Sequence, residues 1–297
     1  MARQLTYAQR LVLINRWKNP PGSSEQLRLE RAERMVKEAV RRHEPFEDLA
    51  ITVVAKGSYP NKTNVRGDSD VDIMVKLNDP FHTNGLASSW WNGRYTGPWT
   101  EANLRLEVHA ALTNHFGRVD ADHNIAFYVP EVTGSRPSID VVPCFKWLQY
   151  AGLGIQHEGS VVYGRNGKQI INWPEQQLVN GRAKNTNTKL RYKFVVRVLK
   201  NVENDLAAEG VIKVLPSYFS ECLIYNVPDH VFLDGDLDDS VRGSLRKVYQ
   251  QLTSFFGPQR MWEPNGMKKV FGEGQKWNEK DARELIEGAW HYLGYGG

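Results

Sequence analysis

The sequence predicts an α+β fold in which a mixed sheet flanked by helices comes first and a mainly helical part follows. Two short stretches, residues 50–55 and 71–75, are rich in β-branched residues or alternate between acidic and apolar ones, which is typical of strands. Residues 186–208 instead carry an apolar side chain at every fourth position, which indicates a helix with one buried face. We therefore expect two lobes, residues 1–165 with the sheet and residues 166–297 with the helices.

The other elements follow from apolar spacing and from Gly and Pro positions. The pattern predicts helices over residues 7–17, 23–42, 103–116, 218–225, 237–256 and 278–292, and strands over residues 124–132 and 138–142. Ser23 and Ser24, followed by Glu25 and Gln26, resemble a capping box at the start of the second helix. Residues 81–100 are expected to form a long loop, either a functional lid or a surface loop packed by its own tryptophans, and the Gly- and Asn-rich residues 154–184 to link the lobes.

Composition narrows the class of protein. The chain has 297 residues, of which 41% are hydrophobic and 24% charged, as in an ordinary globular protein. It contains neither a run of about 18 apolar residues nor a signal-peptide core, so we expect no membrane span and a cytoplasmic location. The net charge of +4 suits a polyanionic small molecule and does not indicate the concentrated basic face that duplex nucleic acid requires.

The two cysteines, Cys144 and Cys222, are far apart in the sequence and are too few for a cysteine-rich zinc site. Both are surrounded by apolar residues. We therefore expect buried, unreactive thiols and no structural zinc.

The chemistry-bearing segment contains two carboxylates, Asp70 and Asp72, separated by one residue. On a strand such residues point to the same face, where they repel each other unless a cation lies between them. Mg²⁺ prefers oxygen ligands and often retains substrate phosphates in its shell. The pair is a candidate metal platform, although solvated acidic pairs at strand ends are common.

Two neighbouring features strengthen this interpretation. Gly57-Ser58 follows a strand directly, and such a turn can bind phosphate oxygens through backbone N–H groups and a hydroxyl, although a simple β-turn gives the same pattern. Asp140 lies in an apolar, strand-like run, where an unpaired carboxylate is costly. A metal ion explains it, and so does a salt bridge to Arg136.

The stretch from Lys56 to Asp72, with the later Asp140 on a strand, resembles the polymerase-beta-like nucleotidyltransferase superfamily. It is most similar to the bacterial cGAS/DncV-like nucleotidyltransferases (CD-NTases), which make cyclic di- or trinucleotide signals in CBASS anti-phage defence. Residues 184–188, 192–200 and 215–221 resemble the helical-lobe motifs of the same family. The resemblance implies a two-lobed fold, with a mixed sheet lobe, a helical lobe and an active site in the cleft between them.

The resemblance also implies roles for single residues. Asp70, Asp72 and Asp140 would be catalytic and would hold two Mg²⁺ ions, with Mn²⁺ as a substitute. Gly57 and Ser58 would cradle phosphates, Lys200 and Ser217 would contact the triphosphate, and Tyr218 would stack on a base. Structural roles compete with the last three: a solvated helix-face lysine, a helix cap and a core tyrosine. Arg66 and Asp68 are expected to shape the loop before Asp70.

The implied activity joins nucleoside triphosphates into a cyclic product, releases pyrophosphate and, through that product, activates a downstream effector protein. An enzyme that extends RNA 3′ ends or modifies a protein, and a catalytically silent nucleotide- or RNA-binding module, are the alternatives. The presence of all three carboxylates argues against a silent module. The absence of a Cys/His zinc insertion argues against activation by DNA. The sequence specifies neither the bases nor the linkage.

Overall fold

The computed structural model describes residues 4–66, 70–84, 98–151 and 154–296, and the chain divides into two compact units. The sheet unit comprises Gly22–Tyr59 and Asp68–Pro174, and the helical unit comprises Met1–Pro21, Pro60–Gly67 and Glu175–Gly297. The short segment from Pro60 to Gly67 therefore belongs to the helical unit, although the residues on both sides of it belong to the sheet unit. The division into domains at residues 165 and 166 stays a prediction.

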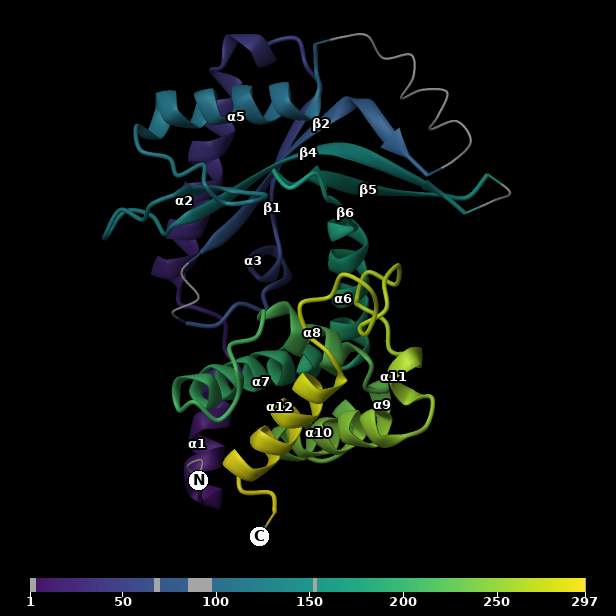
Figure 1. The fold of residues 1–297 in the computed structure, drawn as a ribbon. Coiled ribbons are helices and arrows are strands. Elements are labelled where there is room, and N and C mark those ends of the chain that lie inside the picture. The colour runs from purple at the N-terminus through teal and green to yellow at the C-terminus, as the bar shows by residue number, and fades with distance from the viewer. Residues whose placement is uncertain (1–3, 67–69, 85–97, 152–153, 297) are drawn as a thin grey trace. The chain divides into compact units, whose positions relative to one another are not determined.

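The sheet is mixed, as the sequence predicted (Figure 1). Its strands are β1 (Ile51–Lys56), β2 (Val71–Thr83), β3 (Phe127–Val129), β4 (Ile139–Tyr150), β5 (Gln156–Tyr163) and β6 (Gln169–Asn172). The order is β1-β2-β4-β5-β6, and β3 pairs with β4. The pair β2–β4 is parallel and the others are antiparallel. Two strands that carry predicted site carboxylates, β2 and β4, are therefore direct neighbours.

Helices cover the strands of this unit. The helices α2 (Ser23–Arg41) and α5 (Glu101–Phe116) pack against each other, α2 also against β1 and β2, and α5 also against β4. A short 3₁₀ helix, η1 (Glu44–Phe46), and the single-turn helix α3 (Ser58–Asn61) complete the described elements. The predicted capping box is wrong, because the N-cap of α2 is Gly22, which has no side chain to accept a hydrogen bond, and Ser23 is already helical.

The helical unit consists of α1 (Tyr7–Trp17), α6 (Pro174–Asn187), α7 (Arg191–Ala208), α8 (Tyr218–Tyr225), α9 (Asp229–Leu233), α10 (Leu237–Thr253), α11 (Gly257–Arg260) and α12 (Glu279–Tyr292). Helix α7 is central, since it packs against α1, α8, α9, α10 and α12. The predicted helix over residues 186–208 begins late. Lys189 and Leu190 adopt positive φ angles of 49° and 70°, which break the helix between α6 and α7.

Three regions differ from the expectations. Residues 154–184, for which only a linking role was expected, form β5, β6 and most of α6. Gly159 lies within β5 because no side chain fits there: a Cβ would lie 2.6 Å from the carbonyl oxygen of Asn172. Within residues 124–132 only the short β3 forms. Of the expected loop over residues 81–100, residues 81–83 complete β2, and residues 85–97 lie outside the described part.

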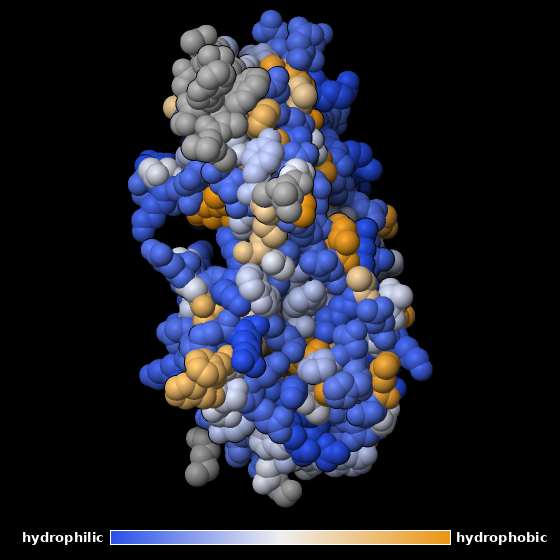
Figure 2. All heavy atoms as spheres, turned by 90° about the vertical axis from the view of Figure 1, so that its right-hand side faces the viewer, coloured by the Kyte–Doolittle hydropathy of each residue, from blue (hydrophilic) through white to orange (hydrophobic). Residues whose placement is uncertain are grey.

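The surface is mainly hydrophilic on the face shown in Figure 2, with small separate hydrophobic patches. Among the described residues, no helix is long and apolar enough to cross a membrane. Cys144 and Cys222 are buried free thiols, as expected.

Candidate active site

A row of four polar residues crosses the sheet at one level. In the strand register, Lys56 of β1 is the partner of Asp72 in β2, Asp72 is the partner of Asp140 in β4, and Asp140 is the partner of Tyr128 in β3. Neighbouring strands lie about 4.8 Å apart, so the two carboxylates are held side by side. Sequence reasoning assigned no role to Lys56 or Tyr128, because strand pairing depends on residues far apart in the chain.

The carboxylates repel one another. Burial raises the pKa of Asp140, and the negative charges of Asp72 and then Asp70 raise it further. His123 and Lys56 oppose this shift. A cation beside these carboxylates would relieve the repulsion that favours the protonated form of Asp140.

Asp70 lies immediately before β2 and is tied to the start of β4. The hydroxyl of Ser138 donates a hydrogen bond to Asp70 Oδ1, and the backbone N–H of Val71 donates to the Ser138 carbonyl over 3.1 Å. Ser138 is therefore a site residue that was not predicted from the sequence. Its position two residues before Asp140, in the run of residues 138–142 that is expected to form a strand, was the available signal. Asp68 of the preceding loop lies outside the described residues.

Gly57 forms the turn that brings the chain against Asp72. Its φ angle is +76°, a conformation that favours glycine, and a Cβ at this position would lie 3.1 Å from Asp72 Oδ2. Ser58 follows as the first residue of α3. The turn therefore lies close to the carboxylate of Asp72, as we expect for a site that binds phosphate and metal.

Arg136 does not account for Asp140. Its guanidinium Nη1 donates to the carbonyls of Pro130, over 2.5 Å, and Pro137, over 3.3 Å, and it lies over the ring of Phe116. Arg136 therefore serves to tie down the loop before β4. The charged groups closest to account for Asp140 are instead Asp72 and Asp70, which raise its pKa.

The donor atoms suit a hard cation, because all three side chains are carboxylates. Within residues 4–66, 70–84, 98–151 and 154–296, however, no group of three or more His, Cys, Asp or Glu side chains is already arranged to hold a metal ion. Asp70 instead accepts the hydrogen bond from Ser138. Asp72 and Asp140 are register partners that would share a cation, and Asp70 would join them by exchanging this bond.

The other predicted site residues belong to the helical unit. Lys200 of α7 is only 1% exposed, so it is not a solvated helix-face lysine. Ser217 is the N-cap residue of α8 but its side chain makes no capping bond. The Tyr218 ring packs 6.4 Å from the Trp277 ring, and its hydroxyl donates to Glu263 over 3.3 Å, which supports a core role.

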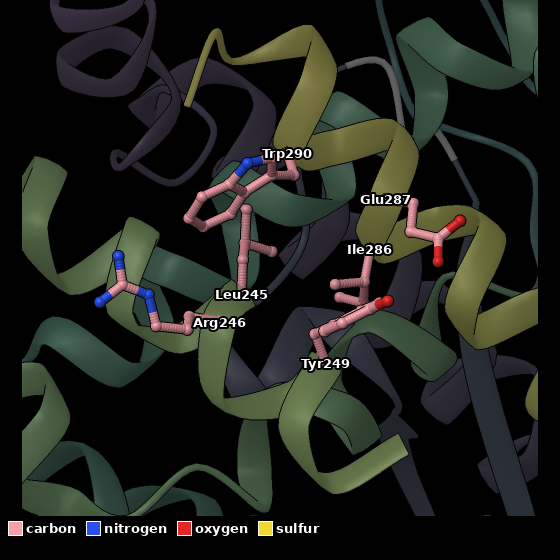
Figure 3. A pocket seen from close by; sticks show the side chains of 6 residues that line it. All are labelled: Leu245, Arg246, Tyr249, Ile286, Glu287 and Trp290. Carbon is pink, nitrogen blue, oxygen red and sulfur yellow. The ribbon is translucent and has the colours of Figure 1, made fainter. Parts of the chain in front are cut away.

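A cavity of ≈ 360 Å³ also lies in the helical unit, between α10 and α12 (Figure 3). Its walls are mainly apolar and are formed by Leu245, Arg246, Tyr249, Ile286, Glu287 and Trp290. None of the predicted site residues lines it. We therefore place the chemistry at the sheet carboxylates and not in this cavity.

A mixed sheet with aspartates paired across parallel strands, a Gly-Ser turn against them and a helical unit is the architecture of a polymerase-beta-like nucleotidyltransferase. The model of the cGAS/DncV-like nucleotidyltransferase C-terminal helical domain matches residues 179–294. The cyclic dipyrimidine nucleotide synthase CdnE of Legionella pneumophila is 32% identical over 289 residues, which cover 94% of this chain and 96% of that protein. The chain belongs to the cGAS/DncV-like nucleotidyltransferases.

Solved structures agree with this assignment. The Elizabethkingia meningoseptica CdnE cyclic dinucleotide synthase, with GTP and Apcpp, has a TM-score of 0.80 at 30% identity, covering 96% of this chain and 99% of that one. The Rhodothermus marinus CdnE c-UMP-AMP synthase, with Apcpp and Upnpp, has a TM-score of 0.83 at 28% identity, covering 96% and 97%. The similarity therefore extends over both units.

Proposed function

We propose that this protein joins nucleoside triphosphates into a cyclic di- or trinucleotide second messenger and releases pyrophosphate. The observation that carries the proposal is the register pairing of Asp72 with Asp140, beside Asp70 and against the Gly57 turn. The relatives named as cyclic nucleotide synthases support the same activity.

The three carboxylates are proposed to bind two Mg²⁺ ions, with Mn²⁺ able to replace them. When bound, the metal supplies positive charge that acidifies the acceptor ribose hydroxyl and neutralises the triphosphate. Asp140, whose pKa is raised by burial and by the neighbouring carboxylates, is the group proposed to receive the hydroxyl proton. Gly57 and Ser58 would bind phosphate oxygens through the backbone and the Ser58 hydroxyl.

Contacts from the helical unit to the donor nucleotide are a second part of the proposal. Ser217 makes no capping bond, so its hydroxyl is able to bind a phosphate oxygen. Lys200 would supply a cation to the triphosphate, and Tyr218 would stack on a base. The packing of Tyr218 against Trp277 argues that its ring supports the core instead, so among these three Ser217 is the strongest candidate.

The bases of the product are not specified by overall similarity. Relatives at 32%, 32% and 34% identity are named for dipyrimidine, dipurine and UMP-AMP products respectively. A few hydrogen bonds to the base edges decide such a choice. The product itself must therefore be identified by mass spectrometry and linkage-specific nuclease digestion.

The test is incubation of the purified protein with labelled nucleoside triphosphates and Mg²⁺, without RNA. A phosphatase-resistant small product, formed together with pyrophosphate, supports the cyclase. Label that appears only in added RNA or in protein would identify one of the other nucleotidyl transfers. No turnover of any nucleotide, by protein that binds nucleotides, would identify a silent binding module. A role in anti-phage defence, through an effector that binds the product, is tested by phage challenge with active and inactive variants.

A further inference from the structure

The segment between the Gly57 turn and Asp70 is fastened to the helical unit by one buried carboxylate. Glu221 of α8 is 1% exposed, yet three side chains donate hydrogen bonds to it. Asn61 Nδ2 and Gln177 Nε2 each donate to Glu221 Oε1 over 3.2 Å, and Thr63 Oγ1 donates to Oε2 over 2.8 Å. Two of these three donors, Asn61 and Thr63, come from the segment of residues 60–66, here called the clamped segment.

A second buried side chain holds the same segment through its backbone. Arg197 of α7 is 3% exposed, and its Nη1 donates to the carbonyl of Lys62. Lys62 has a φ angle of +55°, which is uncommon for a residue with a side chain. The clamped segment is therefore held at three consecutive residues in one specific conformation.

The buried groups of this clamp are costly to place. Asn61 is 2% exposed, and its Oδ1 has no hydrogen-bond partner, while Gly181 of α6 lies so close that a Cβ there would be 3.4 Å from this oxygen. Burying a carboxylate, and an amide oxygen that has no hydrogen-bond partner, lowers the stability of the folded protein. Such groups are therefore expected to have a role other than stability. Stability alone would be better served by apolar residues of similar volume.

The clamped segment lies in the chain between the phosphate turn and the first carboxylate, and this position suggests the role of the clamp. Asn61 and Ser58 are the last and first residues of the single-turn helix α3, and Gly57 precedes it against Asp72. At the other end the chain continues towards Asp70. A movement of residues 61–63 would therefore be transmitted along α3 to the phosphate turn that precedes it, and small misplacements of reacting groups reduce rates steeply.

We propose that Glu221 is a positioning residue for nucleotidyl transfer, which acts through Asn61 and Thr63 to hold the clamped segment. This inference rests on the proposed function for its kinetic part. Glu221 touches neither the carboxylates nor the turn in the contacts described above, so its effect is on geometry. Glutamine is an adequate substitute, because its amide oxygen can accept from Asn61 and Gln177 while its N–H₂ donates to the Thr63 hydroxyl.

The test compares Glu221→Leu with Glu221→Gln and with a matched control, Glu203→Leu. Glu203 of α7 is also buried, at 3% exposed, and accepts a hydrogen bond from Ser220 of α8 over 2.5 Å. We expect Glu221→Leu to lower kcat by about tenfold or more, with less than about a twofold change in KM. Glu221→Gln should restore most of kcat, and Glu203→Leu should lower the unfolding midpoint with kcat unchanged.

Hydrogen exchange supplies a readout that does not need activity. Exchange of the amides of residues 61–66 should rise in Glu221→Leu and in Thr63→Val, and should stay at the wild-type level in Glu203→Leu. Equal kcat losses in Glu221→Leu and Glu203→Leu, or unchanged exchange in Glu221→Leu, would overturn the proposal. If the wild-type protein makes no nucleotide product, the proposed function fails, and the exchange comparison still decides whether Glu221 holds the segment.

Discussion

Asp72 and Asp140 are partners in the register of two parallel strands, β2 and β4, so their carboxylates share one level of the sheet. This pairing leads us to predict that neither is replaceable. We expect Asp72→Asn and Asp140→Asn each to reduce product formation at least about a hundredfold, because each removes a charged ligand that the transition state needs. The unfolding midpoint should stay the same or rise, since one repulsive charge is lost. Asp122→Asn, which alters an exposed carboxylate of the same unit, is the control and should keep full activity.

Metal binding can also be tested without activity, through its effect on the free energy of unfolding. Mg²⁺ that binds the folded chain raises its free energy of unfolding by about 2.7 kcal/mol at a hundred times the dissociation constant. We expect Mg²⁺ to raise the unfolding midpoint of the wild-type protein and not that of the Asp72→Asn, Asp140→Asn double variant. Chelation by EDTA should end product formation, and Mn²⁺ should restore it. Full activity in EDTA would show that the metal assignment is wrong.

Gly57 offers a test of the contact between turn and carboxylate. Gly57→Ala places a Cβ at a φ of +76° and 3.1 Å from Asp72 Oδ2, so it should both strain the backbone and displace the carboxylate. Gly117→Ala is the matched control, with a φ of +77° and nothing within 4 Å of the added atom. Each should cost roughly 1 kcal/mol of stability from the left-handed backbone. Only Gly57→Ala should lose activity, and equal activities would refute the contact.

The parts of the fold that were predictable have local signals. The helices α1 and α8 match their expected ranges because apolar spacing and flanking polar residues mark them. The site aspartates of β2 and β4 were recognised because carboxylates in apolar strands are conspicuous. The row from Lys56 to Tyr128 was not, because pairing across strands is a long-range property.

Two further errors have physical reasons. The strands within residues 154–184 were not predicted, because glycine is rare in strands, yet Gly159 lies in a strand where a neighbouring backbone leaves no room for a side chain. The Glu221 clamp was missed because a glutamate in an apolar helix stretch gives no sign of its distant partners, Asn61 and Thr63. In both cases the structure depends on contacts between residues far apart in the chain, which the local sequence does not reveal.

The cysteines provide a check on the two cores. Burial raises the pKa of Cys144 to about 12 and that of Cys222 well above its ordinary value. Since only the thiolate reacts, neither should react with a disulfide reagent at pH 8 in the folded protein, and both should react after denaturation. Rapid reaction of one thiol without unfolding would show that its core opens readily.

We expect Lys193 of α7 to make the free energy of unfolding depend on pH. Burial lowers its pKa from the ordinary 10.5 to about 8, against the favourable charge of Glu221, and Arg182, Arg197 and Lys62 lower it further. Below pH 8 the lysine is protonated in both states and the full penalty for burying its charge applies. Between pH 8 and 10.5 the unfolded chain binds more protons than the folded one, so stability rises with pH, by on the order of 3 kcal/mol in total.

Denaturant unfolding of the wild type and of Lys193→Met across this range measures the effect. The difference in unfolding free energy between them should change in favour of the wild type as the pH rises from 8 to 10.5, because the variant has no proton to lose at this position. In Glu221→Leu the rise should begin at a lower pH, since the favourable charge on Lys193 is gone. A difference that stays flat over the whole range would mean that Lys193 is charged and solvated in the folded protein, against its 7% exposure.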